Sequence, residues 1–429
     1  MEVVESRMKK ISSLKFTKGL RSIAVLSMGS LAAQALNFLG SIVIAKQYSD
    51  ISIGQFSFFL SIVAMFSTVI NGRYDVQIVS ANNDDEVNAL VKLSSIVMIV
   101  LSAIITGVCM FLSAVGKMDN VEVKWQILFI FPLLVVSGLI NILNSYNNRQ
   151  SEYRLISEAY LLRTISQNLI FFGTGLFCPT TTALLTGQLV GQLSGVGKQS
   201  RKLICHLNDI ASVPRYKIVS IAKKYKGQLI FSVPASFLNA VSYSIISLLV
   251  GNCFGMSTLA LYSYSVRVLG LPLSIFSANI AKVHYRNAIN ELYQTRSFSK
   301  CTKKTVLFAI ALAIVMAVVL MLFAPKLFEL IYGHNWRMAG VYVQILTPMF
   351  SLRMIVGAIG FTFIIANKQK LELLFQALLI VVFWGISIIV KVFTLEMIQF
   401  IFLLSIAYSL IYLCELISMT FISRKVVNQ

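Results

Sequence analysis

Long apolar segments separated by short polar stretches run along almost the whole sequence. About 20 apolar residues in a helix suffice to cross the ~30 Å hydrocarbon layer of a bilayer, and the segments have about that length. Charged residues make up 13% of the chain, whereas soluble domains carry roughly 25%. The pattern therefore predicts an all-α integral membrane protein with several membrane-spanning helices.

We predict about twelve transmembrane helices. The sixth is short and rich in glycine, which favours close packing against neighbouring helices. The longest polar stretch, 198–226, separates six helices from six. We therefore expect an N-terminal lobe (1–197), a basic cytoplasmic connector (198–226) and a C-terminal lobe (227–429). The predicted spans are 20–45, 51–70, 93–115, 126–146, 155–177, 181–197, 227–250, 258–281, 305–324, 338–366, 371–391 and 397–422.

The basic residues indicate how the chain is oriented. With these twelve spans, 28 of the 37 Lys and Arg residues lie on the side of the N-terminus and six on the opposite side. Because Lys and Arg are enriched in cytoplasmic loops, both termini are predicted to be cytoplasmic. The net charge of +20 is spread over many short loops, which excludes a basic nucleic-acid-binding domain. We expect a multi-pass protein of the bacterial cell inner membrane.

The connector 198–226 carries eight Lys and Arg residues. Such a segment is typical of an amphipathic element that lies on anionic membrane lipid. Binding of a protein partner is the alternative interpretation.

The sequence contains no pattern typical of catalysis. The three histidines lie in loops, and the six cysteines are scattered without a CxxC pair. Phosphate-binding GxxxxGK[ST] and zinc-binding HExxH motifs are absent. We therefore expect neither an enzyme nor a bound metal or cofactor.

Four arginines lie within or at the ends of predicted spans: Arg353 and Arg267 near the bilayer middle, Arg163 nearer the cytoplasmic side and Arg73 at the end of 51–70. A charge at the bilayer centre costs at least ~2.5–3.5 kcal/mol, so it should face water or a partner. A guanidinium in a hydrated cavity would bind phosphate or carboxylate groups of a substrate. The alternatives are ion pairs between helices and, for Arg163 and Arg73, side chains that extend to the interface.

Polar residues within the spans permit two further interpretations. Glu415 is the candidate for proton coupling, because a carboxyl group in a low dielectric can carry a proton, and an ion pair is the alternative. Other polar side chains could select a sugar or could form hydrogen bonds between helices. These are Asn141, Asn144, Gln167, Asn168, Gln188 and Tyr264.

Two stretches resemble Wzx-type polysaccharide flippases of the multidrug/oligosaccharidyl-lipid/polysaccharide (MOP) exporter superfamily. The first, residues 332–376, is similar to their tenth and eleventh helices. The second contains an Arg-Tyr-acidic motif, Arg73-Tyr74-Asp75, followed by the acidic loop Asp84-Asp85-Glu86. The matching residues of the first stretch are Gly333, Trp336, Ala339, Gly340, Tyr342, Leu346, Pro348, Phe350, Arg353, Asn367, Lys368, Gln369, Glu372, Leu373 and Leu374.

The resemblance implies two six-helix lobes that form a V around a cationic cavity. It implies translocation of undecaprenyl-pyrophosphate-linked oligosaccharide repeat units of O-antigen or capsule, in lipopolysaccharide or capsule biosynthesis. Membrane lipid, a polysaccharide polymerase and a chain-length regulator would be partners. The family's basic cavity residues correspond to Arg353, Arg267, Arg163 and Arg73.

Two other function classes compete with this one. A MATE-like drug exporter of the same fold would usually place acidic groups in its cavity for cationic drugs, whereas this chain offers cations. A membrane-embedded glycosyltransferase or polymerase would need catalytic acids and usually a sizeable loop. The loops predicted on the outer side are too short for such a domain.

Overall fold

The computed structural model describes residues 29, 31–116, 124–366 and 368–424. Over these residues the regular secondary structure is entirely helical. The predicted cytoplasmic termini and the beginning of the predicted span 20–45 fall outside the described residues. The predicted all-α class is confirmed.

Nine helical segments of the described chain are long and apolar enough to cross a membrane. Helices α6 (Tyr153–Phe177) and α7 (Thr181–Gln199) occupy two further predicted spans but do not belong to the nine. The total of twelve stays a prediction. The nine are Asp50–Ser67, Asp84–Ala114, Trp125–Arg149, Gln228–Phe254, Met256–Thr295, Ser299–Tyr332, His334–Ile365, Gln369–Phe393 and Met397–Arg424.

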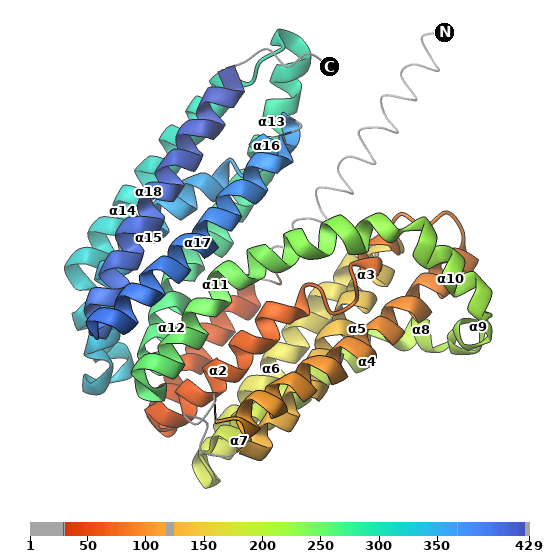
Figure 1. Ribbon diagram of the computed structural model, residues 1–429, viewed down its shortest axis with the longest axis horizontal. Coiled ribbons are helices and arrows are strands. Elements are labelled where there is room, and N and C mark those ends of the chain that lie inside the picture. The colour runs from red at the N-terminus through yellow and green to blue at the C-terminus, as the bar shows by residue number, and fades with distance from the viewer. Residues whose placement is uncertain (1–28, 30, 117–123, 367, 425–429) are drawn as a thin grey trace. The chain divides into compact units, whose positions relative to one another are not determined.

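The chain divides into two compact units, of which the first comprises Met1–Tyr48 and Phe66–Phe237. Its helices α4 and α5 pack together, and α6 packs on α7 (Figure 1). Besides α6 and α7, the unit contains helical residues 31–47, α3 (Tyr74–Gln77), α4 (Asp84–Ala114), η1 (Lys124–Phe129), α5 (Ile130–Arg149), α8 (Arg201–Ile204), α9 (Leu207–Ser212), α10 (Arg215–Lys224) and the π-helical turn η2 (Gln228–Ser232).

The predicted connector 198–226 packs within the first unit. Helices α9 and α10 contact α4, and Ile210 and Ile221 are buried there against residues that include Leu90. Lys224 donates a hydrogen bond to Glu86, and the Tyr225 hydroxyl donates to the same carboxylate at 3.0 Å. The hydrogen bond to Glu86 raises the pKa of Lys224. Apolar packing and an ion pair therefore hold α10 against the first turn of α4.

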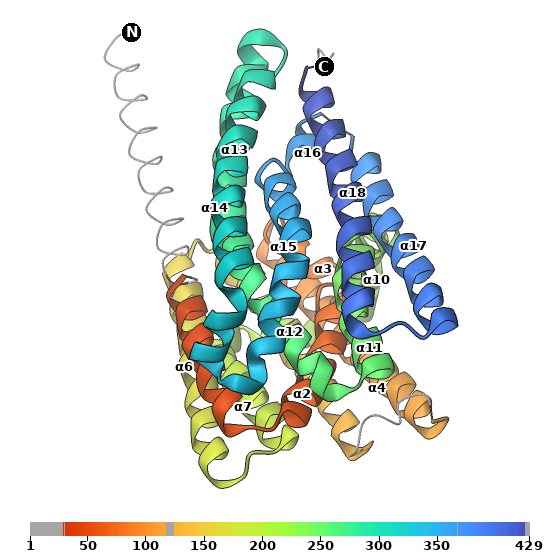
Figure 2. The ribbon, with the colours of Figure 1, turned by 90° about the vertical axis from the view of Figure 1, so that its left-hand side faces the viewer.

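The second unit comprises Ser49–Met65 and Leu238–Gln429. Its helix α15 contacts α12, α14 and α18 and is therefore central to the unit (Figure 2). The unit contains most of α2 (Asp50–Ser67) and of α11 (Val233–Phe254), followed by α12 (Met256–Pro272), the π-helical turn η3 (Leu273–Ser277), α13 (Ala278–Thr295), α14 (Ser299–Tyr332), η4 (His334–Trp336), α15 (Arg337–Ala358), α16 (Thr362–Ile365), α17 (Gln369–Phe393) and α18 (Met397–Arg424).

Close backbone approach between helices depends on small residues in this unit. A Cβ atom added at Gly340 of α15 would lie 2.5 Å from Cα of Pro325 on α14. A Cβ atom at Gly54 of α2 would lie 1.8 Å from the carbonyl oxygen of Met256. Neither contact leaves room for a larger residue, as is typical of membrane helices that pack through glycine.

Candidate functional site

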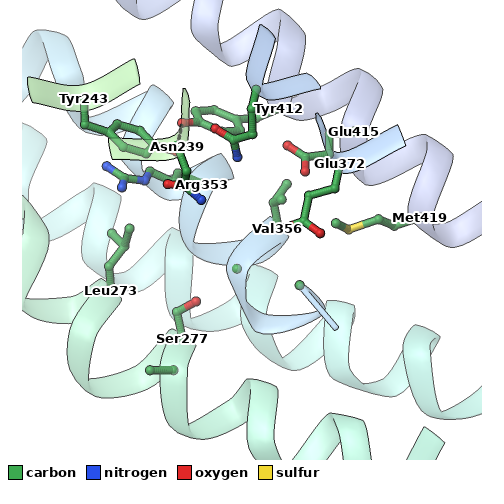
Figure 3. Close-up of a pocket in the computed structure, with 14 residues that line it drawn as sticks. Asn239, Tyr243, Leu273, Ser277, Arg353, Val356, Glu372, Tyr412, Glu415 and Met419 are labelled. Carbon is green, nitrogen blue, oxygen red and sulfur yellow. Dashed lines mark hydrogen bonds between the residues drawn. The ribbon is translucent and has the colours of Figure 1, made fainter. Parts of the chain in front are cut away.

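The second unit contains a cavity of ≈ 320 Å³ that is lined by both polar and apolar residues. Six helical elements contribute to it: α11, η3, α13, α15, α17 and α18. Figure 3 shows the residues that line it. They are Asn239, Tyr243, Leu273, Ser277, Ala278, Arg353, Val356, Gly357, Gly360, Glu372, Gln376, Tyr412, Glu415 and Met419.

Helical periodicity places three of these side chains on one face of α18. Tyr412, Glu415 and Met419 all line the cavity, and residues three, four and seven positions apart share a helix face. The spacing of Tyr412, Glu415 and Met419 is visible in the sequence and could have shown that they share one face of α18.

The π-helical turn η3 brings the chain close to α15. It directly follows Pro272, whose ring removes a backbone donor from the helix. The Ser277 hydroxyl donates to the carbonyl oxygen of Met354 at 3.2 Å, and a Cβ atom at Gly357 would lie 2.4 Å from the same hydroxyl oxygen. Helix distortions of this kind are frequent at functional sites.

Arg353 is half-buried at one end of the cavity. Its guanidinium carbon lies 3.6 Å from the ring centroid of Tyr243 and 5.6 Å from that of Phe350. Within the described chain, Arg353 takes part in no ion pair. Its positive charge is therefore held by an aromatic face and is not neutralised by a carboxylate.

The opposite end of the cavity is acidic. The carboxyl groups of Glu372 and Glu415 lie near each other there (Figure 3). Glu415 is only 4% exposed. The cavity thus presents a cation at one end and a pair of carboxyl groups at the other.

Arg267, the second arginine predicted near the bilayer middle, lies outside this cavity lining. Its guanidinium carbon is 5.1 Å from the ring centroid of Tyr264, which packs in turn against Trp336 at 4.3 Å. No ion pair to Arg267 occurs among the residues described here. Arg267 and Arg353 therefore share the second unit and an aromatic support, but only Arg353 lines the cavity.

Arg163 belongs to the first unit. Its guanidinium carbon lies 5.1 Å from the Tyr160 ring centroid, and its Nε atom is buried without a hydrogen-bond partner. A Cβ atom at Gly195 of α7 would lie 2.2 Å from its Cγ, so the aliphatic part of Arg163 packs closely on α7.

Arg73 also belongs to the first unit, at the turn before α3. It adopts a left-handed backbone conformation with φ 60° and ψ 11°, and its Nε atom is buried without a partner. Burial raises the pKa of the nearby Asp75 carboxyl group, and the charge of Arg73 opposes this shift. A non-glycine residue in this conformation is uncommon.

Several polar residues considered for sugar selectivity join helices of the first unit. The side-chain amide of Gln167 donates to Gln188 at 2.5 Å. Asn141 donates to the backbone carbonyl oxygen of Ser67 at 2.9 Å, and Asn168 donates to Asn37 at 3.4 Å. These contacts agree with the interpretation as hydrogen bonds between helices.

Five of the polar cavity residues that were not singled out as site residues from the sequence are Asn239, Tyr243, Glu372, Gln376 and Tyr412. They come from α11, α17 and α18, whereas Arg353 lies on α15, so no local spacing connects them with Arg353. The described residues contain no group of three or more His, Cys, Asp or Glu side chains that could hold a metal ion.

Comparison with known protein families gives one match over most of the chain. The profile of a family described as "Polysaccharide biosynthesis protein" matches residues 53–341. A search of curated protein sequences found no match.

Solved structures with a similar fold include MOP superfamily transporters. The lipid II flippase MurJ in an inward closed conformation has a TM-score of 0.66 and 14% identity, covering 93% of this chain and 90% of its own. A MOP superfamily transporter from Pyrococcus furiosus has a TM-score of 0.57 and 14% identity, covering 93% and 95%. An inward-facing multidrug resistance MATE family transporter has a TM-score of 0.56 and 14% identity, covering 91% and 95%.

Proposed function

The chain belongs to the polysaccharide biosynthesis protein family, and from this premise we propose that it is a flippase for a lipid-linked oligosaccharide. The substrate would be an undecaprenyl-pyrophosphate-linked repeat unit of O-antigen or capsule. The chain is a multi-pass membrane protein with the fold of MOP superfamily transporters. In this proposal the polar head of the substrate crosses the inner membrane while its lipid tail remains in the bilayer.

One observation carries the proposal: Arg353 lines a cavity between apolar helices, and no carboxylate neutralises its guanidinium group. Such a charge costs at least ~2.5–3.5 kcal/mol in a bilayer unless water or a partner solvates it. A guanidinium presents a planar set of N–H donors that matches the oxygen geometry of a phosphate group. The pyrophosphate of a lipid-linked sugar supplies the complementary charge.

The other three arginines take secondary parts in this proposal. Arg267 would extend the positive field of the second unit from its aromatic support at Tyr264. Arg163 and Arg73 would contribute positive charge in the first unit, where each has a buried Nε atom without a partner. Fixed charges of one sign raise the local concentration of oppositely charged substrates.

Glu415 is the proposed proton-coupling residue, with Glu372 as its neighbour. Two nearby carboxyl groups in a low dielectric favour sharing a proton because both cannot ionise easily. Exchange of this proton with one side of the membrane would couple a proton gradient to transport.

The acidic end of the cavity favours one alternative function. Carboxyl groups in a cavity attract cations, so Glu372 and Glu415 would suit a cationic small molecule exported by a protein of the same fold. Growth of a drug-sensitive strain that expresses the chain, in the presence of cationic antimicrobials, tests this alternative. Resistance that depends on Glu415 would support it over the flippase.

The proposal is tested in a strain that lacks the gene. We expect that the strain loses its surface polysaccharide and accumulates the lipid-linked repeat unit at the cytoplasmic leaflet. The native chain should restore the polysaccharide, whereas Arg353→Ala should not. Arg337→Ala is the matched control, because Arg337 begins the same helix and its side chain is 64% exposed.

Two results would contradict the proposal. One is normal surface polysaccharide in the deletion strain. The other is full restoration by Arg353→Ala at the membrane level of the native protein. If the cognate polymerase and chain-length regulator are partners, their removal should shorten the polysaccharide without stopping translocation of single repeat units.

A further inference from the structure

The contact between Tyr243 and Arg353 is the shortest cation–aromatic contact of the described chain. A separation of 3.6 Å between the guanidinium carbon and the ring centroid is van der Waals contact, so the guanidinium lies on the face of the ring. Figure 3 shows the two side chains together at one end of the cavity. The pairs Arg163–Tyr160 and Arg267–Tyr264 are looser, at 5.1 Å each.

The ring of Tyr243 is itself held by neighbouring helices. Its hydroxyl is 3.1 Å from that of Tyr412 on α18, and one of the two donates to the other. One turn earlier on α18, the Tyr408 hydroxyl donates to the carbonyl oxygen of Leu379 on α17 at 3.1 Å. The Tyr243 ring beside Arg353 is therefore hydrogen-bonded to α18, and α18 is in turn hydrogen-bonded to α17.

An aromatic support has a different consequence from an ion pair. A carboxylate would neutralise Arg353 and occupy its N–H donors, whereas a ring face attracts the cation through its quadrupole and accepts none of the in-plane N–H bonds. Arg353 donates no hydrogen bond that the described residues accept. The contact thus fixes the position of the guanidinium and leaves its charge and donors available.

We propose that Tyr243 is a positioning residue that holds the Arg353 guanidinium ready to bind a phosphate group. This inference rests on the proposed function, because it assigns the anion to Arg353. Tyr412 completes the arrangement by orienting the Tyr243 ring. Tyr243 does not itself bind the anion, and it acts through the guanidinium.

The test measures binding to the purified full-length protein in detergent by calorimetry, with inorganic pyrophosphate and farnesyl pyrophosphate as probes. Tyr243 is replaced by Phe and by phenylalanines that carry one, two, three or five fluorines. These rings keep their shape while their attraction for a cation falls stepwise. We expect affinity for both probes to fall stepwise in the same order, a trend that a purely structural role would not produce.

Replacing Tyr243 with other natural amino acids gives a second measurement of its effect on binding. Tyr243→Leu should weaken binding about ten-fold, a factor that corresponds to about 1.4 kcal/mol and lies within the range of cation–π interactions. Tyr243→Trp should restore most of the affinity because its ring face binds cations well. Tyr342→Leu is the matched control: Tyr342 is 4% exposed on the same helix as Arg353 and does not line the cavity.

The outcomes separate this inference from the proposed function. If Arg353→Ala weakens binding but the fluorinated series does not, the role of Tyr243 is wrong and the anion site remains. Tighter binding by Tyr243→Leu would mean that the ring competes with the anion, and would also overturn the inference. If the native protein binds neither probe, or Arg353→Ala binds both as well as the native protein, the anion site and the role of Tyr243 both fail.

Discussion

Arg353 and Glu415 line the same cavity from the packed helices α15 and α18, yet no ion pair joins them. Tyr243 supports the arginine, and Glu372 lies near the glutamate. Opposite charges that are buried together normally pair. Their separation leaves Arg353 available to a ligand and Glu415 available to a proton.

Arg353→Lys should retain part of the function that Arg353→Ala loses. Lysine keeps the charge but cannot present a planar, bidentate set of donors or stack as a flat group on Tyr243. We expect pyrophosphate affinity to fall about ten-fold for Lys and about 100-fold for Ala, in the range of hydrogen bonds to charged groups. Calorimetry on the purified variants measures this. Equal affinities for Lys and Arg would show that charge alone matters.

Glu415→Gln should uncouple transport from a proton gradient. The amide cannot exchange a proton, so the rate in proteoliposomes should be the same with and without a pH gradient. Pyrophosphate affinity should stay unchanged, because Glu415 lies at the other end of the cavity from Arg353. Glu372→Gln should weaken the coupling in the same direction.

Glu396→Gln is the control for this experiment, since Glu396 is exposed between α17 and α18. It should keep the gradient dependence of the native protein. Gradient-driven transport by Glu415→Gln at the native rate would exclude the coupling role.

Gly340→Ala should destabilise the second unit. The added methyl group would lie 2.5 Å from the backbone of Pro325, and overpacking of this kind costs typically about 1–3 kcal/mol. Gly385→Ala on α17 is the matched control, because a Cβ atom there meets nothing within 4 Å. Thermal unfolding in detergent should show a lower midpoint for Gly340→Ala only. Equal midpoints would show that α14 can shift to accommodate the methyl group.

Glu86→Ala should release the α8–α10 segment from α4. Glu86 is 5% exposed and accepts hydrogen bonds from Lys224, Tyr225 and the backbone of Asn82. Loss of these hydrogen bonds costs about 1 kcal/mol of the free energy that holds the segment against α4. The rate of chymotrypsin cleavage within 200–226 should therefore rise about five-fold. Asp85→Ala is the control, because its 2.6 Å ion pair with Lys217 is surface-exposed and such pairs contribute little. Similar cleavage of both variants would contradict this role of Glu86.

The sequence predicted helix positions better than it predicted side-chain partners. The Gly-rich stretch 181–197 is indeed helical, as α7 (Thr181–Gln199). The helices extend beyond the predicted spans 258–281 and 305–324: α12, η3 and α13 run without a break over Met256–Thr295, and α14 covers Ser299–Tyr332. Hydropathy marks the part of a helix that lies in lipid, whereas hydrogen bonding continues into the polar ends.

The candidate site was only partly visible in the sequence. Arg353 attracted notice because a charge in an apolar helix is costly. Arg267 met the same criterion and has an aromatic support too, but it does not line the cavity. Tyr243 carried no comparable signal, because a tyrosine within an apolar helix is ordinary. Glu372 belongs to the stretch 332–376 that carries the family resemblance, but nothing in the sequence indicated that its side chain faces a cavity.

By itself, the amino-acid sequence determined that this protein is a helical membrane protein with unusual buried charges. That follows from local physics, since every backbone polar group in lipid must be satisfied within its own helix. Only the tertiary structure decided that Arg353 rests on Tyr243 and faces the cavity apart from Glu372 and Glu415. Those relations depend on how four separate helices, α11, α15, α17 and α18, pack together. The period of one helix carries no information about the rotation of its neighbours.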